Sequence, residues 1–322
     1  MPDFVLDTDL PPSHLKLMVQ LAPGHPTGLN LSNPVIAASG TFGYGDEYSE
    51  ITDIQRLGAI VCKGTTLNPR QGNPQPRLVE TASGLLNSIG LENIGVDRLV
   101  REKAPVWAEW KVPVIVNIAG ESLKEYKDLA AKLRGVKGIA ALELNISCPN
   151  IKAGGIEFGR RPDLTARVTA AVKARNELPL IVKLSPNVSD IVPIARAAAR
   201  EGADALCLVN TLKGMAIDIP GKKKLPAFGS GGLSGPAIKP VALYMVYAVA
   251  EAVDKPIVGC GGIESVQDVL EFMAAGARAV EIGTASFTNP STMINIIKDL
   301  TDYLSRSGIN DINQLVGTAH RW

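Results

Sequence analysis

The stretch Ala140-Ala-Leu-Glu-Leu144, followed by Asn145-Ile-Ser-Cys-Pro-Asn150, is an apolar run that ends in polar residues, and apolar runs of this kind recur along the chain. Its apolar first half is typical of a buried strand, and Pro149 cannot continue a β-ladder, so the strand ends just before Cys148. Glycines at 154, 155 and 159 then indicate a loop. The sequence therefore places a thiol between two amides at the end of a strand. That position suits chemistry, but also the packing of a small apolar side chain, since free cysteines are often buried.

The same strand pattern recurs along the whole chain, and each apolar run precedes a segment with helical periodicity. The apolar runs are 35–39, 59–63, 114–118, 141–146, 180–184, 205–210, 256–259 and 279–283. Helices are expected at 48–57, 96–110, 123–134, 164–176, 191–201, 236–253, 266–275 and 292–306. Strictly alternating strands and helices, with strands that are apolar throughout, predict an α/β fold of the (β/α)8 TIM-barrel type. A doubly wound sheet is the alternative.

The segments outside this alternation complete the expected architecture. Residues 16–22 and 28–31 are predicted to form an N-terminal hairpin that closes the bottom of the barrel. Residues 1–16 are expected to be an extended arm, and 17–322 a single barrel domain. Two connections, 64–95 and 212–235, are too long for simple turns and leave the carboxyl ends of strands two and six. The active site of this fold lies at that rim, so both are expected to be long rim loops over it.

The composition excludes several classes of function. With 33 basic and 32 acidic residues, the chain has no net field that would attract nucleic acid or a membrane, and it contains no apolar run of 18 residues. Its cysteines form no Cys-x-x-Cys pair, which argues against a metal site or an iron–sulfur cluster held by this chain alone. Unpaired cysteines suit a cytoplasmic protein. The three histidines lie near the termini, so a histidine-based triad is not expected.

Glycines end the last two strands of the predicted barrel. Strand seven runs into Gly259-Cys-Gly-Gly-Ile263 and strand eight into Gly283-Thr284. Glycine lets backbone N–H groups approach an anion closely, and a helix N-terminus that follows adds its positive dipole end. Barrels of this type often bind phosphate after strands seven and eight. The sequence therefore predicts a ligand that carries a phosphate.

Polar side chains end five other strands, at Lys63-Gly64, Asn117, Asn145, Lys183 and Asn210-Thr211. A lysine within an apolar strand is costly unless its charge meets a partner, so a structural ion pair would explain one of the two lysines. Two lysines and three amides at the same end of the barrel fit a hydrogen-bond-rich, anionic heterocycle better. Flavin mononucleotide (FMN) has one phosphate and one such heterocycle, and a nearby positive charge stabilises its reduced form.

These motifs together resemble dihydroorotate dehydrogenase, from about residue 17 to the C-terminus. The motifs are Ala38-Ser-Gly-Thr-Phe-Gly43, Lys63-Gly-Thr-Thr-Leu67, Gly72-Asn-Pro-Gln-Pro-Arg77, Asn87-Ser-Ile-Gly-Leu91, Asn145-Ile-Ser-Cys-Pro-Asn150 and Gly259-Cys-Gly-Gly262. Each motif alone is weak, but their joint order along the chain is specific. The family oxidises dihydroorotate to orotate in the de novo synthesis of pyrimidines (UMP).

The resemblance implies a role for each matching residue. FMN is expected to contact Ser39, Lys63, Gly64, Asn117, Asn145, Lys183, Val209, Gly235, Gly261, Gly262, Gly283 and Thr284. The substrate is expected to contact Lys63, Asn87, Ser88, Ile89, Gly90, Leu91, Asn145, Asn210 and Thr211. Cys148 is expected to remove the proton from C5 of dihydroorotate while hydride passes from C6 to N5 of the flavin. No residue is expected to bind a metal.

A cysteine base is similar to the class 1 enzymes, since the membrane-associated class uses serine there. The segments Lys63-Gly-Thr-Thr66 and Thr81-Ala-Ser-Gly-Leu-Leu-Asn87 resemble the class 1B catalytic subunit more than the fumarate-using class 1A. Class 1B implies a partner subunit with FAD and a [2Fe-2S] cluster that passes electrons to NAD, and a homodimer core within a heterotetramer. The alternatives are a class 1A enzyme or related dihydropyrimidine oxidoreductase, a flavin-free barrel lyase or isomerase, and a non-enzymatic binding scaffold.

Overall fold

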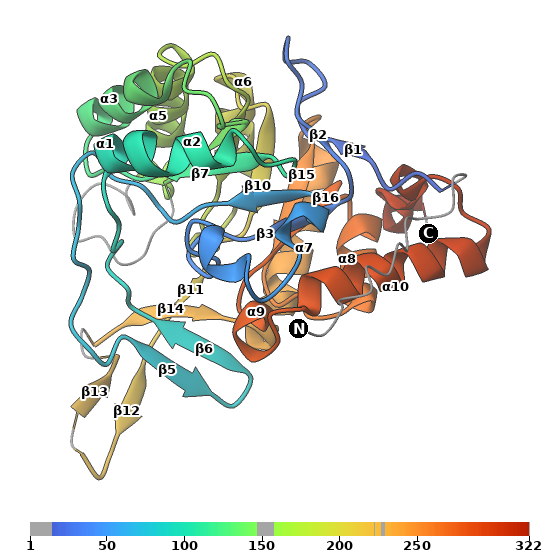
Figure 1. Cartoon of the computed structure of the whole chain (residues 1–322). Coiled ribbons are helices and arrows are strands. Elements are labelled where there is room, and N and C mark those ends of the chain that lie inside the picture. The colour runs from blue at the N-terminus through green and yellow to red at the C-terminus, as the bar shows by residue number, and fades with distance from the viewer. Residues whose placement is uncertain (1–14, 147–157, 222, 227–228, 322) are drawn as a thin grey trace, which may run out of the picture.

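The structure, a computed structural model, describes residues 15–146, 158–221, 223–226 and 229–321. Its centre is a closed barrel of parallel strands in the order β10-β15-β16-β3-β4-β7-β8-β9 (Figure 1). Their bounds are β3 (Val35–Ala37), β4 (Ala59–Val61), β7 (Val114–Ile118), β8 (Ala141–Asn145), β9 (Leu180–Lys183), β10 (Ala205–Leu208), β15 (Ile257–Cys260) and β16 (Ala279–Ile282). Each strand begins within one residue of the start of a predicted run and ends within two residues of its end. The TIM barrel is confirmed, and the doubly wound alternative is wrong because the sheet closes on itself.

The barrel strands are buried on both faces, which is why they are apolar throughout instead of alternating. In β7, for example, Ile115 and Val116 are both fully buried although they point to opposite faces. Helices cover the outside of the barrel, and side chains fill its interior. Three charged side chains interrupt the pattern and are nevertheless buried, namely Glu143, Lys183 and Glu281.

Six of the predicted helices form close to their expected bounds: α3 (Leu123–Leu133), α5 (Pro162–Lys173), α6 (Val192–Arg200), α7 (Lys239–Ala252), α8 (Val266–Ala274) and α10 (Thr292–Ser307). Local signals fix several of their ends. Ser122 caps α3, and Ser265 with Asp268 forms a capping box at the start of α8. Gly308 ends α10 in the left-handed conformation that glycine adopts without strain.

The prediction of a helix at residues 48–57 is wrong. The segment instead contains the short 3₁₀ helix η2 (Ile54–Arg56), and another, η1 (Asp46–Tyr48), ends where the predicted helix was to begin. The carboxylate of Asp53 accepts a hydrogen bond from the backbone N–H of Gln55, which starts a new turn at that point. Aspartate competes in this way with the hydrogen bonds of a continuous helix.

The helix predicted at 96–110 is shorter and less regular than expected. Its pieces are α1 (Val96–Arg98), the π-helical turn η3 (Leu99–Lys103) and α2 (Ala104–Trp107). Pro105 has no backbone N–H to donate to the preceding turn, so a wider turn before it is the physical consequence.

The two long connections are more than loops, because their strands form a separate sheet over the rim. The first connection contributes β5 (Leu78–Thr81) and β6 (Gly84–Asn87), and the second β11 (Leu212–Gly214) and β14 (Gly231–Ser234). They pair in the order β11-β14-β6-β5, and the hairpin of β12 (Ala216–Asp218) and β13 (Lys223–Leu225) projects beyond them (Figure 1). Gly84 permits this packing, since an added Cβ would lie 2.0 Å from the carbonyl oxygen of Ser234.

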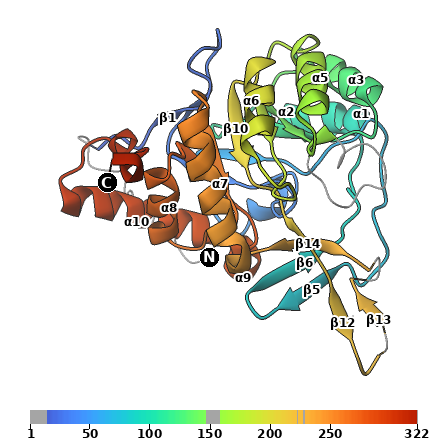
Figure 2. The same ribbon diagram turned by 180° about the vertical axis from the view of Figure 1, so that it is seen from behind.

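The predicted N-terminal hairpin is present as β1 (Val19–Gln20) and β2 (Asn30–Leu31), paired antiparallel. Both views show the hairpin at the end of the barrel opposite the four-stranded sheet (Figures 1 and 2). Leu21 and Leu31 are fully buried, so the hairpin closes that end. Most of the predicted arm, residues 1–14, lies outside the described residues. Within the part of the chain that is described, no helix is both long and apolar enough to cross a membrane.

Candidate active site

A cavity opens between the carboxyl ends of the barrel strands and the four-stranded sheet. Its empty space, including the part open to solvent, is about 1,290 Å³. Every barrel strand sends a residue into its wall: Ser39, Lys63, Asn117, Asn145, Lys183, Val209, Gly261 and Gly283, in chain order. The residues of β6 and the turn after it form the roof over them.

The structure brings together all but two of the predicted site residues. Those that line the cavity are Ser39, Lys63, Gly64, Asn87, Ile89, Gly90, Leu91, Asn117, Asn145, Lys183, Val209, Asn210, Thr211, Gly235, Gly261, Gly262, Gly283 and Thr284. Ser88 is not among the lining residues; it is buried, and its hydroxyl accepts a hydrogen bond from Asn73 at 3.1 Å. Cys148 lies outside the described residues.

Glycines form the part of the cavity that was predicted to bind phosphate. Gly235, Gly261 and Gly262 all have positive φ, at 87°, 135° and 72°. A Cβ added to Gly262 would lie 2.8 Å from the carbonyl oxygen of Gly235, so the close approach requires glycine. The backbone N–H groups of Gly261, Gly262 and Thr284 donate no hydrogen bond to another described residue. Three backbone donors at one end of a cavity suit an anion such as phosphate.

A chain of amide side chains crosses the cavity floor. The Nδ2 atom of Asn117 donates to Oε1 of Glu143 at 2.5 Å and to Oγ of Ser39 at 3.3 Å. Asn145 donates to Oδ1 of Asn117 at 3.3 Å, and Asn210 donates to Oδ1 of Asn145 at 3.4 Å. These bonds fix the orientation of amides from three strands. A planar heterocycle with several donors and acceptors needs partners of fixed orientation.

The two cavity lysines differ in their partners. Nζ of Lys183 lies 2.5 Å from Oε2 of Glu281 and 3.7 Å from Oε1 of Glu143, and all three side chains are buried. Burial acts to lower the pKa of Lys183, but the acidic groups around it, which are Cys207, Glu143, Glu281 and Cys260, outweigh burial and raise that pKa well above its usual value. Lys63 has no carboxylate partner among the described residues. The structural ion pair expected for one lysine is therefore found on Lys183.

Glu143 and Glu281 were not predicted from the sequence as residues of the site. A signal was available, because each interrupts a run that is otherwise apolar, as Lys183 does. Burial and the nearby Glu281 raise the pKa of Glu143 to about 8, even though Lys183 and the hydrogen bond from Asn117 act to lower it. At pH 7 Glu143 is therefore mainly protonated, and the charge of Lys183 is balanced by the one carboxylate of Glu281.

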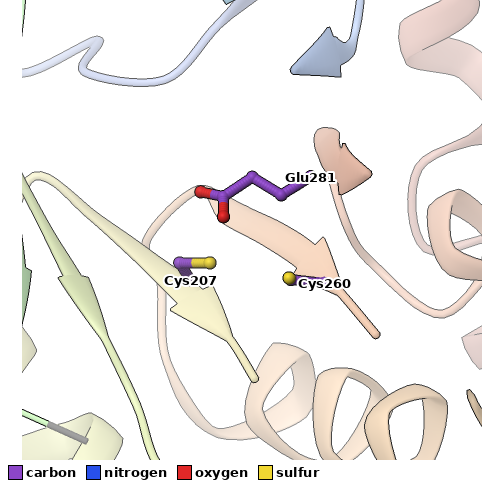
Figure 3. A group of neighbouring side chains, drawn as sticks. All are labelled: Cys207, Cys260 and Glu281. Atoms are coloured by element: carbon purple, nitrogen blue, oxygen red, sulfur yellow. The ribbon is translucent and has the colours of Figure 1, made fainter. Parts of the chain in front are cut away.

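Two cysteines extend this buried cluster toward β10 and β15. The thiols of Cys207 and Cys260 and the carboxylate of Glu281 come within 4.8 Å of one another (Figure 3). Thiolates and a carboxylate at such distances can hold a thiophilic metal ion. Here, however, the ammonium of Lys183 already contacts Glu281, so a divalent ion would have to displace a resident cation. Burial also raises the pKa of Cys207 well above its usual value, which leaves it a neutral thiol.

The barrel and its polar, glycine-lined rim cavity define a TIM-barrel protein with a site for an anionic, hydrogen-bond-rich ligand. The family model described as dihydroorotate dehydrogenase matches residues 24–304. The chain belongs to the dihydroorotate dehydrogenase family. The resemblance inferred from the sequence motifs is thereby confirmed.

Curated relatives place the chain more closely within this family. The protein named "Dihydroorotate dehydrogenase B (NAD(+)), catalytic subunit" of Desulforudis audaxviator is 55% identical over 294 residues, which cover 91% of this chain and 96% of the relative. The protein of the same name from Desulforamulus reducens is 57% identical over 294 residues, with the same coverage. A solved structure of the Eimeria tenella enzyme in complex with ferulenol matches 98% of this chain and 91% of its own at a TM-score of 0.79. Its identity of 23% supports the fold alone.

Proposed function

We propose that this chain oxidises (S)-dihydroorotate to orotate, with FMN as the hydride acceptor, as the catalytic subunit of an NAD-linked enzyme of pyrimidine (UMP) synthesis. One observation carries the proposal: a single cavity collects the ends of all eight barrel strands together with the Asn87–Leu91 segment. These are the positions to which the family motifs assign flavin and substrate. The names of the relatives at 55% and 57% identity support the same activity.

The residues present fit FMN. The free N–H groups of Gly261, Gly262 and Thr284 would hold its phosphate, next to a close approach of Gly262 to Gly235 that leaves no room for a Cβ. Asn117 and Lys183 would face the polar edge of its ring system from the cavity floor. Bound there, the flavin would supply the capacity to accept a hydride.

The remaining polar groups fit a small planar carboxylate. Lys63 offers an ammonium without a carboxylate partner in the described chain, which a substrate carboxylate can pair with. Asn87, Asn145 and Asn210 add amide groups around it. The strands β5 and β6 lie over the rim, where they would exclude water from the reacting carbon atoms.

Proton removal is assigned to Cys148 on the strength of the family motif alone. The thiolate of Cys148 would take the proton from C5 of dihydroorotate. An unperturbed cysteine has a pKa of roughly 8.5, so a base that works near neutral pH needs a neighbouring positive charge.

Electrons would leave through a second subunit that carries FAD and a [2Fe-2S] cluster, with NAD as the final acceptor. The words "catalytic subunit" in the relatives' names support a partner. A homodimer core within a heterotetramer, a single catalytic domain at 17–322 and a cytoplasmic location belong to the same proposal. The fumarate-linked class 1A enzyme is the alternative acceptor class.

The proposal is tested by anaerobic stopped-flow spectroscopy of the purified chain. It should be yellow, release FMN on denaturation, and lose its flavin absorbance when mixed with dihydroorotate. NAD reduction should require the partner subunit, whereas strong fumarate turnover by the chain alone would favour class 1A. A colourless preparation that cannot take up FMN would contradict the proposal and favour a barrel lyase or isomerase.

A further inference from the structure

The ammonium on the cavity floor is not a free charge. Lys183 lines the cavity, and behind it, away from the cavity wall, lie Glu281 at 2.5 Å and Glu143 at 3.7 Å. The side chains of Glu143 and Glu281 are 0% exposed. One oxygen of each carboxyl group, Oε2 of Glu143 and Oε1 of Glu281, has no hydrogen-bond partner among the described residues. A buried arrangement of this kind is costly, so we considered what it does for the cavity beside it.

Near neutral pH the other groups around Lys183 add no more than the partial negative charge of Cys260. Cys207 on β10 is a buried thiol, and its pKa is held well above the usual value by burial. Cys260 on β15 has a pKa of about 7, lowered by its hydrogen bond with Cys207. Asn117 on β7 is neutral and bonded to Glu143. Glu281 is therefore the main negative charge that faces the ammonium.

An ammonium beside a flavin stabilises the negatively charged reduced form. A carboxylate directly behind the ammonium weakens that effect, because its negative charge cancels part of the ammonium's field at the flavin. A flavin that transfers its electrons to another carrier must not be stabilised too strongly in its reduced form by the protein. Charge compensation behind Lys183 meets that requirement.

We propose that Glu281, supported by Glu143, is a positioning residue for the flavin: it fixes the ammonium of Lys183 at the cavity floor and offsets its charge, which limits how much more tightly the protein binds reduced than oxidised FMN. This inference rests on the proposed FMN site and adds to it residues that do not touch the cofactor. It assigns a function to the two carboxyl groups that the sequence motifs do not include.

The test is Glu281→Gln in a protein that already carries Glu143→Gln, which keeps the shape of both side chains, removes the charge of Glu281 and leaves no neighbouring carboxyl group whose pKa could fall to replace that charge. The dissociation constants of the FMN-free protein for oxidised FMN and for chemically reduced FMN are measured under anaerobic conditions. A unit charge within about 10 Å, at an effective dielectric constant near 20, changes the relative binding of two charge states by roughly tenfold. We expect the preference for reduced FMN to rise by about that factor. Glu109→Gln, which removes an exposed charge after α2, should leave the preference unchanged.

Two outcomes keep this inference distinct from the proposed function. If adding Glu281→Gln leaves the preference for reduced FMN unchanged, the charge-offset inference is wrong while the FMN site stands. If wild-type protein binds neither form of FMN, the proposed function itself fails.

Glu281→Gln leaves the buried ammonium of Lys183 without its main partner, which could prevent folding. A second variant tests the inference in that case. The double variant Lys183→Met/Glu281→Gln removes both members of the pair. Because Glu281 offsets part of the effect of Lys183, this double variant should prefer reduced FMN about tenfold more than Lys183→Met alone does. Equal preferences in the two variants would show that Glu281 offsets no charge and would overturn the inference.

Discussion

Replacing the buried Glu143 with glutamine should make the protein more stable near neutral pH, not less. Burial raises the pKa of Glu143 from 4.5 to about 8. The folded state therefore holds a proton on this side chain over a pH range in which the unfolded chain has released it. Stability falls with rising pH wherever the folded state binds more protons. The favourable contribution is complete below pH 4.5 and is lost as the pH rises toward 8. Glutamine mimics the protonated acid and has no such dependence.

The size of the effect follows from the pKa difference. Between 4.5 and about 8 the two states differ by about 3.5 pKa units. Each unit corresponds to about 1.4 kcal/mol, so the full loss is on the order of 5 kcal/mol by pH 8. At pH 7 it is on the order of 3 kcal/mol, which is a large part of the 5–15 kcal/mol that stabilises a typical domain. The amide of glutamine retains an oxygen that can accept the hydrogen bond from Asn117.

The assay is urea unfolding of wild type and Glu143→Gln at pH 5, 6, 7 and 8, without added flavin. The advantage of the variant should be near zero at pH 5 and should grow with each step, while the urea dependence of the unfolding free energy stays the same. Glu109→Gln, at an exposed position, controls for the loss of a charge as such. A variant that is less stable than wild type at pH 7, or whose advantage does not vary with pH, would refute the reasoning.

Three further predictions concern the site. Cys148→Ala should keep FMN bound but slow the dihydroorotate-driven loss of flavin absorbance by roughly 10²–10⁴-fold at pH 7, as measured by stopped flow, and normal bleaching would remove Cys148 from the mechanism. Gly262→Ala should weaken FMN binding in a direct titration, because its Cβ would lie 2.8 Å from the carbonyl oxygen of Gly235. Lys63→Ala should raise the dihydroorotate concentration needed for half-maximal bleaching by about tenfold or more, and an unchanged concentration would argue that Lys63 does not bind the substrate.

The barrel could be read from the sequence because its strands are buried on both faces. Such strands appear as short continuous apolar runs, and eight of them alternating with helices leave few other folds. The polar residues at their ends were equally visible, since Asn117, Asn145 and Lys183 each interrupt or follow an apolar run. Parallel strands in a barrel place their carboxyl ends at one rim, so these residues were expected to meet, and in the structure they line one cavity.

Elements with weak local patterns were not predictable in the same way. The rim sheet is made of strands that are three or four residues long and rich in glycine, and β6 pairs with β14, which is more than 140 residues away. Its hydrogen bonds depend on the barrel bringing the two connections together. The helix expected at 48–57 failed because the side chain of Asp53 offers the backbone a competing hydrogen bond.

The sequence by itself determined the barrel, the set of residues at its rim and the family to which the chain belongs. Only the tertiary structure decided which lysine is free to meet a ligand and which is already paired. Lys183 and Glu281 are 98 residues apart and stand on β9 and β16, which are not neighbours in the barrel. They meet across its interior, and a charge partner chosen across a closed barrel leaves no periodic signal along the chain.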